Sequence, residues 1–138
     1  MTTEKTRILK RVEFPSAVIE FWENGIVFFQ LTNDYEIDVQ DSKNHANAML
    51  ENPPEGFKKY LVLVDSGNKS TITKEAREES EKSEAHVLTQ AMAVVSISLP
   101  QRIIVNFIFR FFRKRGMPVK LFTTKEKAIE WLLSFERE

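Results

Sequence analysis

The turn Asp65-Ser66-Gly67 is one place where the residue types and their spacing could carry chemistry. It follows directly after the apolar run Tyr60 to Val64, which predicts a central strand covered on both faces. Open α/β sheets present their functional loops at the carboxyl ends of strands. Ser66 is therefore a candidate for phosphorylation, which would add about −1.5 to −2 charges to the turn. Alternatively, Asp65 and Ser66 only shape the turn by bonding to nearby backbone amides.

The other groups that could ligate a metal or act in catalysis are dispersed. His45 and His86 have no second histidine or cysteine at ligand spacing, so we expect no metal and no cofactor. The chain has no cysteine, which excludes disulfides and thiol nucleophiles and fits a reducing compartment. No Gly-rich phosphate loop, HExxH or GxSxG motif is present. No catalytic residue can be named, and we expect a protein that is not an enzyme.

Three carboxylates, Asp34, Asp38 and Asp41, lie close together in the sequence. They could form an acid–base pair. At the start of a helix, however, such residues more often cap the helix and complement its dipole. We expect Asp38 to cap a helix that ends near Asn52.

A candidate partner or ligand surface lies on the predicted helix from Arg102 to Arg113. At about 100° per residue, its polar residues fall within roughly 80° of arc, so apolar side chains take most of the remaining circumference. One face of a sheet cannot cover so wide an apolar surface. The surplus must meet neighbouring helices, a second subunit, a lipid or a ligand. The residues expected at this surface are Phe107, Ile108, Phe111 and Phe112, with Arg110 and Arg113.

Charge is distributed unevenly between two of the predicted helices. The helix beginning at Lys74 is acidic, and the segment from Arg102 to Arg115 is basic. Either both are solvated faces, or they dock between subunits as complementary surfaces. The acidic residues are Glu75, Glu78, Glu79, Glu81 and Glu84, and the basic ones are Arg102, Arg110, Arg113, Lys114 and Arg115.

The elements that position these residues alternate between strands and helices. This order predicts an α/β fold with a mixed, mostly parallel sheet of about five strands, an N-terminal β-hairpin at Asn24-Gly25 and about four helices. A capping box of Thr123 with Glu126 is expected to start the last helix. The predicted strands are Glu13–Phe21, Ile26–Leu31, Tyr60–Val64, Met92–Ser98 and Val119–Phe122, and the helices start near Asp38, Lys74, Arg102 and Thr123.

Length and composition narrow the class of protein. A chain of 138 residues with 42% hydrophobic content suits a single domain, residues 1–138, with its core at about 13–135. Twenty basic and twenty acidic residues cancel, so we expect no nucleic-acid partner. No segment approaches the roughly 18 apolar residues of a transmembrane helix, and no signal peptide is seen. The expected location is the cytoplasm.

Two sequence patterns resemble a known family. The turn VLVDSG and the closing pattern MPVKLFTTKEKAIEWL are similar to those of STAS domains of anti-sigma factor antagonists, and in particular of bacterial SpoIIAA-like proteins. The likeness covers about Glu13 to Phe135. In the antagonists, an Asp-Ser-Ser-Gly turn carries the serine that a partner kinase phosphorylates, and Ser66 is the matching position. Here one serine of the pair is missing, and Asn68-Lys69-Ser70 replaces the Gly-Leu-Gly continuation.

The resemblance implies a regulatory domain that works by protein association, as a homodimer or with an unidentified protein partner. The SpoIIAA-like fold also resembles lipid-transfer domains of the CRAL-TRIO type, which enclose an apolar ligand. The alternative function is therefore the binding of a lipid or apolar small molecule by the Phe-rich helix, with Arg113, Lys114 and Arg115 as contacts for an anionic head group.

Overall fold

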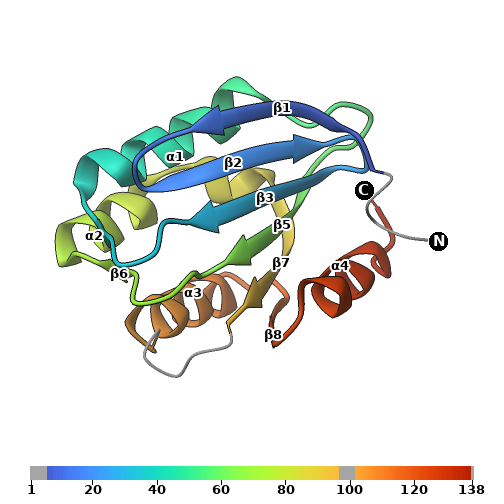
Figure 1. Cartoon of the computed structure of the whole chain (residues 1–138). Coiled ribbons are helices and arrows are strands. Elements are labelled where there is room, and N and C mark those ends of the chain that lie inside the picture. Colours follow the sequence, from blue (N-terminus) through green and yellow to red (C-terminus); the bar gives the residue numbers. More distant parts are fainter. Residues whose placement is uncertain (1–5, 97–101, 138) are drawn as a thin grey trace.

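A computed structural model describes residues 6–96 and 102–137 of the chain. Within these residues the main sheet has six strands in the order β1-β2-β3-β5-β7-β8 (Figure 1). The first three strands are antiparallel neighbours, and the remaining pairings are parallel. The strands are β1 (Ile8–Glu13), β2 (Ala17–Trp22), β3 (Ile26–Leu31), β5 (Tyr60–Asp65), β7 (Thr89–Val95) and β8 (Val119–Phe122).

Helices cover both faces of this sheet. Helices α1 (Val39–Glu51), α2 (Lys74–Lys82) and α3 (Arg102–Lys114) pack on one face, together with the short 3-10 helix η2 (Ala85–Leu88). Helix α4 (Lys125–Leu133) packs on the opposite face (Figure 1). A small parallel pair, β4 (Glu36–Ile37) with β6 (Thr71–Ile72), links the segments that enter α1 and α2. The predicted α/β architecture with a mixed, mostly parallel sheet and four α-helices is confirmed for the described residues.

Side chains alternate between the two faces, as the period of two in a strand requires. In β5, Val62 and Val64 belong to the core beneath α1 and α3, whereas Leu61 and Leu63 belong to the core beneath α4. The continuous apolar run of this strand therefore serves two cores at once. β5 also has parallel neighbours on both sides, which explains why the sequence predicted it as a central strand.

The N-terminal strands differ from the prediction. The expected strand Glu13–Phe21 is the end of β1 and most of β2, with Pro15 in the turn between them. β1 was missed because it is an edge strand. Its sequence ILKRVE is almost wholly exposed, so it lacks the buried alternation that marks an inner strand. The main sheet thus contains one strand more than the five expected.

Two further boundaries are corrected. Thr124, not Thr123, caps α4, since its side chain accepts a hydrogen bond from the backbone amide of Lys127. β7 begins at Thr89 rather than Met92, and the predicted end of this strand at Ser98 lies outside the described residues. The prediction for α1 is confirmed in detail. Asp38 and Asp41 form a reciprocal capping box at its start.

Candidate functional site

An apolar cavity lies between the sheet and the helices on its α1–α3 face. Its volume is about 180 Å³, and its walls come from β3, β5, β7, α1, α3 and the segment around η2. Apolar side chains make up most of the lining, among them Phe29, Met49, Val62 and Ile104. The cavity is partly open to solvent, although many of its lining side chains are buried. A cavity of this size and character can therefore hold an apolar group.

Helix α3 supplies much of the cavity wall. Ile108, Phe111 and Phe112 are all less than 10% exposed and line the cavity, as does the half-buried Phe107. These four residues were the predicted partner or ligand surface, and all four line this one cavity. They face the protein's own sheet and neighbouring helices, however, instead of lying open to a second subunit. The side chain of Arg102 lies outside the described residues.

The two arginines of that predicted surface are on the outer side of α3. Arg110 and Arg113 are both exposed, and the Arg113 guanidinium lies 4.9 Å from the centre of the Phe109 ring. The helix is therefore divided between an apolar side inside the molecule and a basic side in solvent. Trp131 and Phe135 do not cover the apolar side, because they pack with Phe122 on the other face of the sheet.

His45 is a polar residue in the cavity wall. Its Nε2 is hydrogen-bonded to Ser16 Oγ at 2.7 Å, and Phe14 and Phe29 pack against its ring. Burial disfavours the charged imidazolium and lowers the pKa of His45 to about 4, although the nearby Asp41 carboxylate opposes this. The ring is therefore neutral at pH 7. It can offer a hydrogen bond to a ligand without adding charge to the cavity.

Asp41, one turn before His45, is held by other groups. Its carboxylate accepts hydrogen bonds from the Tyr35 hydroxyl at 3.0 and 3.1 Å and from the backbone amide of Asp38 at 2.9 Å. Asp41 thus completes the capping box and anchors Tyr35. The pKa of Asp38 is lowered, chiefly by its hydrogen bond from the Asp41 amide. This geometry supports the capping role of the acidic group and places Asp34 apart, in a turn with positive φ.

The second histidine reaches the same cavity from a different part of the chain. His86 Nδ1 is 2.8 Å from the carbonyl oxygen of Ser83, so Nδ1 donates to it. Its ring meets Phe111 edge-on, with centroids 5.7 Å apart. Sequence spacing could not connect the two histidines, because α1 and η2 come into contact only in the folded protein. Among the described residues, no group of three or more His, Cys, Asp or Glu could hold a metal.

Ser66 lies at the carboxyl end of β5, where the sequence placed it. Its side chain is completely buried, and its hydroxyl donates to the carbonyl oxygen of Val95 at 3.2 Å. Asp65 accepts a hydrogen bond from the backbone amide of Gly67 at 3.0 Å, and Gly67 has a positive φ of 68°. The two side chains thus bond to the backbone, and a kinase could reach the hydroxyl only if the turn opened.

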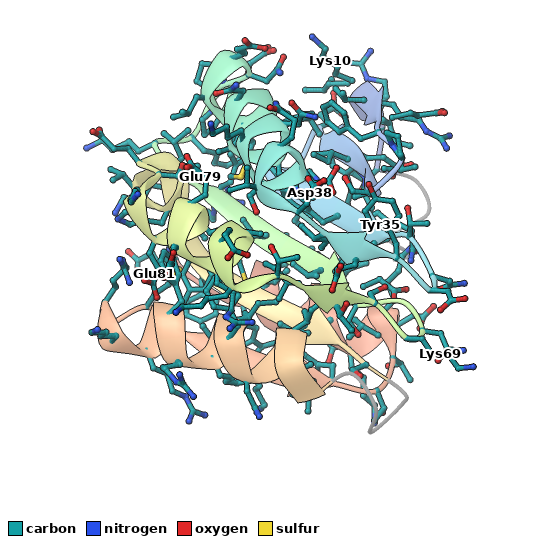
Figure 2. All side chains as sticks on the ribbon, turned by 90° about the vertical axis from the view of Figure 1, so that its left-hand side faces the viewer. Lys10, Tyr35, Asp38, Lys69, Glu79 and Glu81 are labelled. Atoms are coloured by element: carbon teal, nitrogen blue, oxygen red, sulfur yellow. The ribbon has the colours of Figure 1, made fainter. Side chains whose placement is uncertain are left out.

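A groove separates α2 from α3 on the outside of the molecule. Its volume is about 500 Å³, and both helices line it. Figure 2 shows the two helices side by side, with Glu81 of α2 in the space between them. The acidic and basic surfaces recognised in the sequence are therefore neighbours within one molecule. No helix among the described residues is long and apolar enough to span a bilayer.

Comparisons with known proteins place the fold. Residues 21–136 match a family model described as "Domain of unknown function (DUF7793)". A solved structure of similar fold is an uncharacterised protein of the DUF3478 family, with a SpoIIAA-like fold, from Shewanella loihica PV-4. It shares 14% identity and a TM-score of 0.58, over 96% of this chain and 98% of that one. A search of curated proteins found no match.

Proposed function

Since this chain belongs to the DUF7793 family and has a SpoIIAA-like fold, we propose that it is a non-enzymatic, STAS-like regulatory domain that acts through protein association. The single observation that carries this proposal is the fold itself, which extends over nearly the whole chain. Such a domain acts by binding other proteins through its exposed surfaces. The relevant surfaces here are the turn after β5 and the charged outer sides of α2 and α3.

The exposed charges on α2 and α3 support association between copies. Arg110 and Arg113 on α3 and Glu75 and Glu78 on α2 are all exposed. A second copy could place its acidic helix on the basic helix of the first, as in a two-fold interface. The apolar side of α3 faces the cavity inside the molecule and is not available to a second copy. Contact between two copies through α3 must therefore depend mainly on its charged side chains. Contacts of this kind weaken with salt.

Light scattering at micromolar concentration and low salt tests this association. The expected mass is twice the 16.1 kDa of one chain. The double variant Arg110→Glu, Arg113→Glu should shift the mass towards one chain, whereas the control Lys10→Glu, on exposed β1, should not. A mass of one chain at all concentrations would exclude the homodimer.

The cavity favours a second candidate function, the binding of a lipid or apolar small molecule. Ile108, Phe111 and Phe112 are buried in the molecule and still leave a space of about 180 Å³ between α3 and the sheet. The space is partly open to solvent, and an apolar ligand would cover its apolar walls and add dispersion contacts. His45 and His86 supply polar atoms in a mostly apolar wall, together with the hydroxyl-bearing Ser42, Ser80, Ser83 and Thr89.

Native mass spectrometry of protein purified from cells tests this second function. The expected result is a species heavier than the bare chain. In Ile108→Trp, a larger side chain fills the cavity and the added mass should disappear. If the wild-type protein has only the mass of the bare chain and binds no added apolar compound, this function is excluded.

A further inference from the structure

Two phenylalanines form a common wall between the apolar cavity and the groove outside it. Phe107 and Phe111 line the cavity beneath α3, and they also line the groove between α2 and α3. Phe107 is half-buried, as expected of a side chain that borders both an interior space and solvent. A ligand whose apolar part lies in the cavity would therefore have its other end near this groove.

The groove carries more positive than negative charge. Lys74, Arg77 and Arg110 line it from two helices, against Glu78 and Glu81. The formal balance of these five side chains is +1. Arg77 is fixed in place, because its Nη1 donates to the carbonyl oxygen of Ile72 at 3.1 Å.

None of these charges is neutralised by an ion pair within residues 6–96 and 102–137. Ion pairs join Arg7 to Glu23 and Arg11 to Glu13, but these lie on and beside the β1–β2 edge of the sheet, away from the groove. Lys74 and Arg110 are exposed at the groove, and their ammonium and guanidinium groups remain able to bind an anion. Arginine is well suited to this, since its planar fork matches a carboxylate or phosphate.

We propose that the site binds a single-chain amphiphile, with its apolar tail in the cavity and its anionic head group in the groove at Lys74, Arg77 and Arg110. This inference rests on the second candidate function and names the class of ligand. The tail enters beside Phe107 and Phe111. The head group replaces part of its hydration with contacts to cations from both α2 and α3.

The sequence had assigned the head group to Arg113, Lys114 and Arg115, and the structure favours different residues. Arg115 is committed within the protein: its Nη1 and Nη2 donate to the carbonyl oxygens of Phe111 and Glu81, and its guanidinium lies 3.7 Å from the centre of the Phe111 ring. Arg115 thus holds the cavity-lining ring in position. Arg113 stacks over Phe109, which does not line the cavity.

Calorimetric titration with three ten-carbon probes tests the proposal. The probes are decanoate, decanol and decyltrimethylammonium, each below its micelle-forming concentration. Decanoate should bind about tenfold more tightly than decanol, because its carboxylate gains charge-assisted hydrogen bonds. Decyltrimethylammonium should bind most weakly. In Arg110→Glu the preference for decanoate over decanol should vanish, while decanol binding stays unchanged.

The matched control is Arg113→Glu, which makes the same charge change one turn later on α3 and outside the groove. It should keep the preference for decanoate. If decanol and decanoate bind equally and Arg110→Glu changes neither, the head-group assignment is wrong although the cavity binds apolar molecules.

If no probe binds the wild-type protein, both the assignment and the apolar-ligand function are wrong. Binding of all probes should be lost in Ile108→Trp. Should that variant not fold, Ala46→Leu fills the cavity from α1 with a residue that favours helix. Unchanged decanol affinity in a folded Ile108→Trp or Ala46→Leu protein would place the binding elsewhere and overturn the proposal.

Discussion

Ser16 Oγ and His45 Nε2 are hydrogen-bonded at 2.7 Å, across 29 residues of sequence. The bond joins the residue just before β2 to the middle of α1, and Ser16 is completely buried. Because His45 also lines the cavity, this pair connects the packing of α1 on the sheet to the wall of the candidate site. A proton added to the ring would place a buried charge there, which the nearby Asp41 carboxylate offsets only in part.

Stability should therefore fall as the pH drops through the range between the two pKa values of His45. The ordinary pKa of 6.5 applies to the unfolded chain, and burial lowers it to about 4 in the folded protein. Between these values the unfolded state binds a proton that the folded state does not, so acid favours unfolding. The expected loss of unfolding free energy from pH 7 to pH 4 is roughly 3 kcal/mol. Urea unfolding at intervals across this range measures it.

The variant His45→Gln provides the comparison, since glutamine cannot titrate and can still reach Ser16. Its unfolding free energy should vary much less between pH 7 and pH 4. Asp38, whose pKa is lowered from 3.8, affects both proteins equally and acts at lower pH. Parallel pH profiles for the two proteins would show that His45 is not the titrating group.

Ser66 is expected to tolerate removal of its hydroxyl far better than addition of charge. Ser66→Ala loses one hydrogen bond to Val95 and should cost about 1 kcal/mol. Ser66→Glu would bury a carboxylate at a fully enclosed position and should cost more than about 3 kcal/mol. Thermal or urea unfolding distinguishes these. If phosphorylation occurs at Ser66, it should therefore open the turn as well as add charge.

Asn68→Glu is the matched control, because it adds the same charge to the same turn at an exposed side chain. It should change stability by less than about 0.5 kcal/mol. A Ser66→Glu protein as stable as Asn68→Glu would mean that the serine side chain reaches solvent, and that the phosphorylated form needs no opening of the turn.

Much of the fold could be predicted because the buried elements have clear periodicity. The apolar run YLVLV predicted β5, and the capping residue Asp38 predicted the start of α1. Both elements form in the folded protein where these local patterns placed them. β1 could not be predicted in the same way. As an exposed edge strand it has charged residues where an inner strand would alternate, and only its pairing with β2 defines it. Thr123 and Thr124 are both suitable N-cap residues for α4, and only the backbone geometry shows that Thr124 is the cap.

The candidate site was predictable only in part. The wide apolar arc of α3 singled out Phe107, Ile108, Phe111 and Phe112, and these four residues line the cavity. The cavity itself depends on the distance between α3 and the elements α1 and η2. No local sequence pattern predicts this distance. His45 and His86 line the same cavity only because of this tertiary arrangement. The charges at the groove depend in the same way on the placement of α2 beside α3.

The start of α4 offers a paired test of helix capping. Thr124→Ala removes the side chain that accepts from the Lys127 amide and should cost about 1 kcal/mol. Thr123→Ala, at an exposed neighbour that makes no such bond, should cost only a few tenths. Chemical denaturation of the two single variants measures the difference. Equal losses would contradict the assignment of Thr124 as the cap.

Arg137 fastens the end of the chain to the turn between β2 and β3. Its guanidinium donates to the carbonyl oxygens of Asn24 at 2.8 Å and Lys59 at 3.3 Å, and it lies 3.9 Å from the centre of the Phe57 ring. Burial lowers the pKa of Arg137 without an acidic partner to offset it. Arg137→Ala should therefore cost about 2 kcal/mol, since charge-assisted bonds to two segments are lost. Arg113→Ala, on the outer side of α3, should be nearly neutral.

A double variant separates this contact from general loss of packing. Gly25 has a φ of +84°, and a β-carbon there would collide with Arg137 Nη2 and with the Phe57 ring. Gly25→Ala should therefore destabilise the protein by more than 1 kcal/mol, from backbone strain and from displacing the guanidinium. Combined with Arg137→Ala, the loss should be smaller than the sum of the single losses, as measured by urea unfolding. Strict additivity would show that Arg137 does not contact the turn.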